Sequence, residues 1–122
     1  MFAVTIDAKI PIRALKMARK RVQTTLPQIG RENSLIAVAE IRKRCPYRTG
    51  TLRNSIRPQF VSSTEHSYTD EVGSHIHYAA YVEFGTRHMS PRPYLHPGLI
   101  AAKPLMNAHT AMRIRGILRK RF

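Results

Sequence analysis

Apolar residues recur every three or four positions in the first part of the chain, which is the spacing of one helix face. A first helix is predicted from Pro11 onward, with the apolar positions Ile12, Leu15, Ala18, Val22 and Leu26. Pro27 should break or kink it, because proline lacks an N–H group and disfavours helical geometry before it. A second helix then follows, and its apolar positions are Leu35, Val38, Ile41 and Cys45.

The caps and ends of the second helix can also be read from the pattern. Asn33 or Ser34 can cap its start. Its last turn carries Arg42, Lys43 and Arg44, where cations favour the negative end of the helix dipole. Pro46 ends it. Cys45 lies on the apolar side, so we interpret it as a small buried residue and not as a nucleophile.

Strand patterns occupy the N-terminus and the middle of the chain. Phe2–Ile6 predicts a short strand, and Ser55–Ser63 a second one, which Pro58 weakens or places at a sheet edge. Tyr68–His75 alternates as its hairpin partner. The hairpin tip, residues 62–67, is polar and is expected to be flexible until a neighbouring subunit orders it. Tyr78–Phe84 is predicted as a further strand.

The C-terminal part predicts a loop and a final helix. Arg87–Pro93 forms the loop, Pro97 can open the helix, and Pro104 should kink it. The apolar face of this helix is predicted to be Leu105, Ala108, Ala111, Ile114 and Leu118. The chain is therefore expected to be an α+β fold with N-terminal helices, an antiparallel hairpin or sheet, and a C-terminal helix packed on the sheet.

The length of 122 residues corresponds to one domain, 1–122. We divide it into a basic helical arm (1–46), a β-rich middle (47–92) and a C-terminal helix with a basic tail (93–122). A hydrophobic content of 43% is typical of a globular protein. The single cysteine excludes an intramolecular disulfide. No apolar run reaches membrane-spanning length, and the first residues do not resemble a signal peptide, so synthesis in the cytoplasm is expected.

The net charge of +14 is unevenly distributed along the chain. Residues 1–60 carry 13 basic and 3 acidic side chains, residues 61–100 carry 2 and 4, and residues 101–122 carry 6 and none. Two basic arms therefore flank a mildly acidic block. This pattern favours a polyanion, an acidic protein surface or an anionic membrane as neighbour. The alternative is that the basic residues lie on solvated helix faces.

The sequence predicts no catalytic, cofactor-binding or metal-ligating residue. His75 and His77 would share one strand face, and Glu83 or His88 could join them as a metal ligand. A pair of histidines without a fixed third ligand is a weak indication of a metal site, so we interpret them as surface histidines. Glu83 should be partly buried and paired with an arginine. The aromatic residues Tyr78, Tyr81 and Phe84 are interpreted as core and not as a base-stacking platform, so only non-specific phosphate contacts with nucleic acid are supported.

Three segments, Cys45–Ile56, Tyr78–Thr86 and Arg92–Leu99, together resemble the gene-product-ten-like family of tailed bacteriophages over roughly residues 8–115. Members are head–tail joining, neck or tail completion proteins. Two departures are Cys45 where alanine is usual, and the basic run 113–122, which the family pattern does not require. The motif residues to which the resemblance gives a structural role are Thr49, Gly50, Leu52, Ser55, Tyr78, Ala79, Val82, Glu83, Phe84, Gly85, Thr86, Pro93 and Leu95.

The resemblance implies a non-catalytic structural protein of the virion, located at the head–tail interface, without a cofactor and without a membrane partner. It implies a homo-oligomeric ring, six- or twelvefold, beside neck or connector, portal-side adaptor or tail-tube proteins, with non-specific contact to phage DNA. The basic arms and the acidic block would suit the two kinds of surface such a ring needs. The residues expected to contact the DNA channel or an acidic partner are Arg113, Arg115, Arg119, Lys120 and Arg121.

The motif residues also predict local structure, and the charge leaves an alternative function open. Gly50 and Gly85 should lie at chain reversals, and Tyr78, Val82 and Phe84 should fill the core, so that Phe84→Ala would cost about 3–5 kcal/mol. The alternative function is a free regulator that binds nucleic acid without sequence preference, as a monomer or dimer.

Overall fold

The computed structural model describes residues 1–9, 12–47, 50–65 and 67–119. Along the chain the elements are β1 (Phe2–Lys9), α1 (Ile12–Arg44), α2 (Thr51–Ser55), β2 (Arg57–Ser63), β3 (Ser67–Ser74), α3 (Ala79–Phe84) and α4 (Leu95–Arg119). The α+β class predicted from the sequence is confirmed.

The three strands form one antiparallel sheet in the order β1-β3-β2. Phe2 lies opposite Ser74 at one end of β1, and the β2–β3 pairing is shifted by a bulge between Phe60 and Ser62. Both the N-terminal strand and the central hairpin are confirmed. Pro58 lies in the edge strand β2, as predicted, because an edge position leaves one side of the strand free of sheet hydrogen bonds.

Of the two outcomes predicted for Pro27, the break is wrong, since α1 continues through it, and the kink stays a prediction. Val22, Leu26 and Ile29 lie on both sides of the proline and are completely buried. Proline in a helix interior costs about 3 kcal/mol, whereas burying each large aliphatic side chain contributes about 1.5–3 kcal/mol. Packing on either side therefore outweighs the local preference. Helix α4 likewise runs through Pro104, and Pro97 lies in its first turn as predicted.

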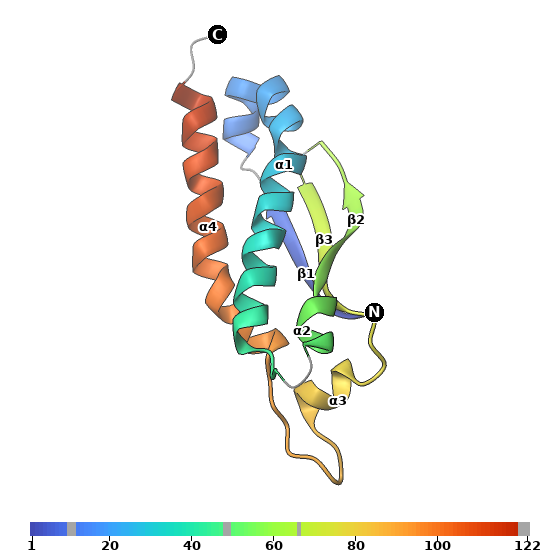
Figure 1. The fold of residues 1–122 in the computed structure, drawn as a ribbon. Coiled ribbons are helices and arrows are strands. Elements are labelled where there is room, and N and C mark those ends of the chain that lie inside the picture. Colours follow the sequence, from blue (N-terminus) through green and yellow to red (C-terminus); the bar gives the residue numbers. More distant parts are fainter. Residues whose placement is uncertain (10–11, 48–49, 66, 120–122) are drawn as a thin grey trace.

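Helix α1 covers one face of the sheet, and α4 lies alongside α1 over much of its length (Figure 1). Among the strands, α4 makes its main contact with β1. The expectation that the C-terminal helix packs on the sheet is thus largely replaced by helix–helix packing. No helix in the described part of the chain is long and apolar enough to cross a membrane.

The predicted apolar face of α4 is also wrong. The buried residues are instead Leu95, Gly98, Ala102, Met106 and Ile117. The reason is that the inner face includes His109 and Arg113, which pair with Glu32 of α1. Polar positions therefore interrupt the buried face, while Leu105 and Leu118 remain exposed on the outside.

The segment Tyr78–Phe84 is not a strand, because Ala79–Phe84 forms the short helix α3. Ala79 and Glu83 are four residues apart and are both buried, which is helical spacing. Short apolar runs do not distinguish helix from strand by periodicity. Phe84 is 70% exposed, so its assignment to the core is wrong, and Tyr81 is exposed as well.

This exposure changes the expected effect of removing the Phe84 ring. The ring makes an edge contact with Phe2 at 5.4 Å between centroids. Such a pair contributes about 0.5–1.5 kcal/mol, so we expect Phe84→Ala to lower the free energy of unfolding by about 1 kcal/mol. Urea denaturation followed by circular dichroism measures this value, and a loss of about 3 kcal/mol or more would contradict it.

Candidate functional site

Helices α2 and α3 and the start of α4 bring the three family-like segments together at one end of the molecule, which we call the motif end (Figure 1). Glu83 lies at its centre and is 5% exposed. Its Oε1 accepts hydrogen bonds from the backbone N–H groups of Tyr94 at 3.0 Å and Leu95 at 2.7 Å. The predicted arginine partner is thus replaced by the N-terminus of α4, where orphan amides and the helix dipole favour a carboxylate.

Tyr94 closes the same junction from the other side. Its hydroxyl donates a hydrogen bond to the Ala79 carbonyl at 3.2 Å, and the N–H of Arg92 donates to the Val82 carbonyl at 2.8 Å. Burial raises the pKa of the Tyr94 hydroxyl far above its ordinary value, and the nearby Cys45 and Glu83 add to this shift. The hydroxyl therefore stays protonated and remains a donor.

The two glycines that the family pattern singles out lie at chain reversals, as predicted. Gly50 has φ 83° and precedes α2, and Gly85 has φ 78° and follows α3. A Cβ atom at Gly85 would come within 2.7 Å of the Pro91 nitrogen. The positive φ and this close approach both require glycine. Thr49 lies outside the described residues. Thr86 forms an isolated bridge with Met89, while Pro93 lies exposed in the following loop.

Ser55 and Leu52 attach α2 to the sheet. Leu52 is buried, and the Ser55 hydroxyl donates to the Leu52 carbonyl at 2.6 Å. The Ser55 hydroxyl also lies 2.6 Å from the Ser74 hydroxyl at the end of β3. These contacts, together with the two glycines and Glu83, lie at the junctions between elements of the motif end.

A cavity of about 680 Å³ lies beside α2 and α3 at the motif end. Its described lining is mainly apolar, with Arg92 as the charged side chain, and consists of Pro46, Gly50, Thr51, Leu52, Tyr78, Val82, Met89 and Arg92. That lining contains no carboxylate or histidine that could act as a general acid or base.

The histidines considered for a metal site do not converge with an available carboxylate. His75, His77 and His88 are exposed, and Glu83 is occupied by the α4 amides. Within the described residues, no group of three or more His, Cys, Asp and Glu side chains is placed to hold a metal ion.

The acidic surface expected from the block of residues 61–100 is reduced by burial. Asp70 is buried and accepts a hydrogen bond from the Ser34 hydroxyl at 2.8 Å, and Glu83 is buried as described above. Half of the four acidic groups in this block are therefore hidden, which leaves Glu65 and Glu71 at or near the surface.

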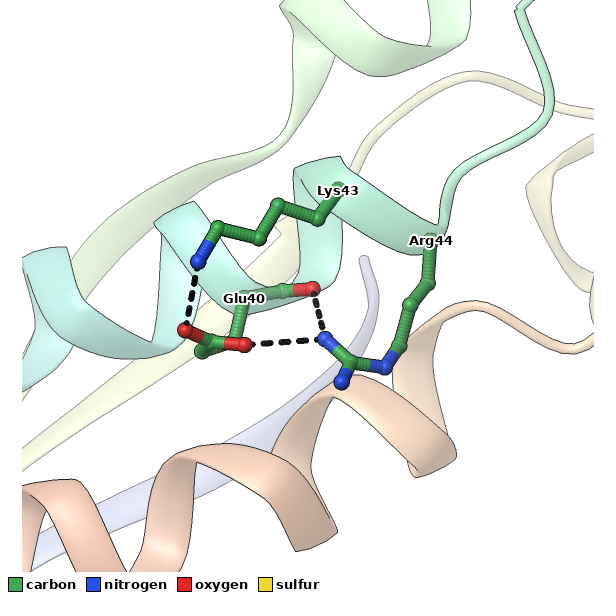
Figure 2. A network of polar contacts seen from close by, with 3 residues as sticks. All are labelled: Glu40, Lys43 and Arg44. Carbon is green, nitrogen blue, oxygen red and sulfur yellow. Dashed lines mark hydrogen bonds and ion pairs between the residues drawn. The ribbon is translucent and has the colours of Figure 1, made fainter.

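The two acidic residues of the described part of α1 are paired within the chain. Glu32 contacts His109 and lies 3.3 Å from the Arg113 Nε atom. Glu40 accepts hydrogen bonds from Lys43 and Arg44, each at 2.9 Å, as Figure 2 shows. These carboxylates are thus engaged before any partner binds.

Glu40 offers a pH-dependent test of this pairing. The hydrogen bond from Lys43, and then that from Arg44, lower the pKa of its carboxyl below 4.5, although burial acts in the opposite direction. The pairing therefore stabilises the fold fully above pH 4.5, and this contribution is lost as the pH falls through the lowered pKa. A carboxyl NMR titration should give a lowered value that moves upward in Lys43→Ala and stays unchanged in Arg115→Ala. An equal response to both variants would contradict the assignment.

A protein-family profile described as "Bacteriophage HK97-gp10, putative tail-component" matches residues 5–85, about two thirds of the chain. The chain belongs to this HK97-gp10-like family. The resemblance inferred from the motifs is confirmed, although the match ends before the Arg92–Leu99 segment. Searches of curated proteins and of solved structures found no match. As an HK97-gp10-like protein, the chain is a bacteriophage structural protein of the tail-related type.

The basic residues proposed as partner contacts fall into two groups in this HK97-gp10-like protein. Arg113 is half-buried and turns toward Glu32 of α1, so it is not a free contact residue. Arg115 and Arg119 are exposed on α4. Lys120 and Arg121 lie outside the described residues.

The exposure of a set of apolar side chains was not predicted from the sequence. They are Phe60 and Val61 on β2 and Ile100, Leu105, Met112 and Leu118 on α4. Pro58 marked β2 as an edge, which was a signal that its apolar residues could lack a partner. For α4, the signal was that apolar residues occur all around the helix.

Proposed function

We propose that this protein is a non-catalytic subunit of a homo-oligomeric ring at the head–tail interface of the virion, acting in head–tail joining or tail completion. The observation that carries the ring is the β2 edge. All seven residues of β2 are exposed, including Phe60 at 58% and Val61 at 48%. An exposed apolar edge strand readily pairs with another chain. Family membership supports the virion location.

The sheet topology supports a closed ring over a simple dimer. β1 and β2 form opposite edges of the sheet, so the molecule presents two different strand surfaces. A head-to-tail contact between unlike surfaces generates a ring when the rotation closes. Thr64 and Ser67, on either side of the hairpin tip, hydrogen-bond to each other through backbone and hydroxyl groups at 2.8 Å. Ordering of the tip by a neighbouring subunit stays a prediction.

Charge sets the conditions for assembly. With +14 per subunit, copies repel one another. The Debye length falls from about 10 Å at 0.1 M salt to about 3 Å at 1 M salt. Association of the isolated protein should therefore be weak at about 0.1 M salt and stronger at about 1 M salt.

Val61→Lys tests the proposed contact. Val61 lies at the bulge and has no partner in the β2–β3 register, so the change should leave the sheet intact while a charge blocks edge pairing. Sedimentation at about 1 M salt should show oligomers for the unchanged chain and monomers for the variant. Leu35→Lys is the matched control, because Leu35 is also exposed, on α1, and it should leave assembly unchanged.

Two results would count against this function. Equal oligomerisation of Val61→Lys and the unchanged chain would exclude the β2 contact. A stable monomer at every salt concentration that binds duplex DNA tightly by itself would support the alternative, a free nucleic-acid-binding regulator. In that case Arg115→Ala should reduce the slope of log affinity against log salt by about 0.9.

A further inference from the structure

The outward side of α4 carries one continuous line of residues at steps of four and three. We call this line the outer stripe, and it consists of Ala101, Leu105, Ala108, Met112, Arg115 and Arg119. Such spacing keeps residues on one helix face. Leu105 is 47% exposed and Met112 is 60% exposed, while Arg115 and Arg119 are exposed as well.

Helix α4 is therefore apolar on two neighbouring sides, about 100° apart around its axis. Its inner side packs on α1 through residues such as Ala102 and Met106. Its outer side presents Leu105 and Met112. A helix that is apolar all round is normally buried, and a contiguous exposed apolar patch marks an interaction site.

The charge of the outer stripe indicates what covers it. Residues 84–122 contain no aspartate or glutamate. The stripe is apolar over its first turns and ends in Arg115 and Arg119. A complementary surface must therefore offer apolar side chains followed by carboxylates.

A second copy of this chain does not meet that requirement. Of its seven acidic residues, Asp70 and Glu83 are buried, and Glu32 and Glu40 are paired within the chain. The other three, Asp7, Glu65 and Glu71, belong to the sheet and its hairpin and do not follow apolar residues on a helix. Two outer stripes facing each other would contribute arginines and no carboxylate. A membrane surface is also a poor match, because α4 contains no aromatic residue of the kind that anchors helices at lipid–water interfaces.

We propose that the outer stripe binds an unlike protein through an amphipathic helix whose apolar residues are followed by aspartates or glutamates. This inference rests on the proposed function, in which the copies contact one another through the β2 edge and leave α4 free for a neighbouring virion protein. In this arrangement the β2 edge binds another copy of the chain, and the outer stripe binds the unlike protein. It also gives Arg115 and Arg119 a protein partner instead of DNA.

A synthetic helical peptide tests the chemistry of this surface. The probe carries leucines at heptad spacing and ends in two turns of glutamates; one comparison peptide ends in lysines, and another has alanines in place of the leucines. In a fluorescence titration the full-length protein should bind the probe at least about tenfold more tightly than either comparison peptide. The double variant Leu105→Gln, Met112→Gln should lose this binding, and Leu35→Gln should keep it, since all three side chains are already exposed.

Reversing the charges of Arg115 and Arg119 tests whether these arginines select the peptide. The variant Arg115→Glu, Arg119→Glu should reverse the preference and select the lysine-ended peptide. Equal binding of all three peptides would overturn the proposal. So would loss of high-salt oligomers in the Leu105→Gln, Met112→Gln variant, because the stripe would then contact another copy. Binding to vesicles of phosphatidylcholine and phosphatidylglycerol that depends on Leu105 would overturn it in favour of a membrane.

The ring proposal and the outer stripe proposal can be tested independently of each other. Val61→Lys should abolish the ring and leave peptide binding intact. If the unchanged chain never forms rings but still prefers the glutamate-ended peptide, the ring function fails and the chemistry of the outer stripe stands. If rings form and the peptides are not distinguished, only the outer stripe proposal fails.

Discussion

Glu83→Ala is expected to lower the free energy of unfolding by about 3–5 kcal/mol, because it leaves two buried amides without an acceptor. The carboxylate is almost completely buried and accepts the N–H groups of Tyr94 and Leu95. These amides belong to the start of α4, where the helix itself offers no partner. The same substitution removes a negative charge from the positive end of the helix dipole.

Glu83→Gln separates the two contributions. A glutamine carbonyl oxygen can still accept both hydrogen bonds, but the charge is gone, so the loss should be about 1–2 kcal/mol. Urea unfolding of both variants provides the measurement. If glutamine and alanine destabilise the protein equally, the carboxylate does not act as an acceptor for these amides. If both are neutral, α4 does not depend on Glu83.

Two glycines in α4 are expected to respond oppositely to the same substitution. A Cβ atom at Gly98 would lie 2.6 Å from the Cα atom of Ile41, at the crossing of α1 and α4. Gly98→Ala must therefore separate the helices, and such overpacking costs about 1–3 kcal/mol or more. At Gly116 no atom lies within 4 Å of an added Cβ, so Gly116→Ala should stabilise the protein by up to about 1 kcal/mol through helix propensity.

The comparison is internally controlled, because both variants add the same methyl group to one helix. In thermal unfolding, the midpoint temperature of Gly116→Ala should be higher than that of the unchanged chain, and that of Gly98→Ala should be lower. Equal shifts in the same direction would mean that helix propensity governs both positions and that α1 and α4 do not approach closely at Gly98.

Local chemistry was sufficient for several features of this protein. The strands predicted at Phe2–Ile6, Ser55–Ser63 and Tyr68–His75 largely coincide with the observed β1, β2 and β3. The reversals at Gly50 and Gly85 follow from the freedom of glycine to adopt positive φ. The family also follows from the sequence, because its motif residues are those that hold the motif end together. Their spacing is visible without coordinates.

Other features depended on contacts between distant residues. The continuity of α1 through Pro27 is decided by burial of Val22, Leu26 and Ile29 against the sheet and α4, which outweighs a local preference. The short helix α3 could not be distinguished from a strand, because a run of five apolar residues and Glu83 is compatible with both periods.

The sequence by itself determined the fold class, the edge position of β2, the glycine reversals and the family. Only the tertiary structure decided which of two apolar sides of α4 faces α1, since Glu32 attracts His109 and Arg113 to the inner side and leaves Leu105 and Met112 outside. It also decided that Glu83 caps α4 and that Asp70 is buried, which reduces the acidic surface expected from the sequence. The physical reason is that hydrogen-bond and ion-pair partners are chosen by distance in space, and a polar residue at a core position is stable only when such a partner is present.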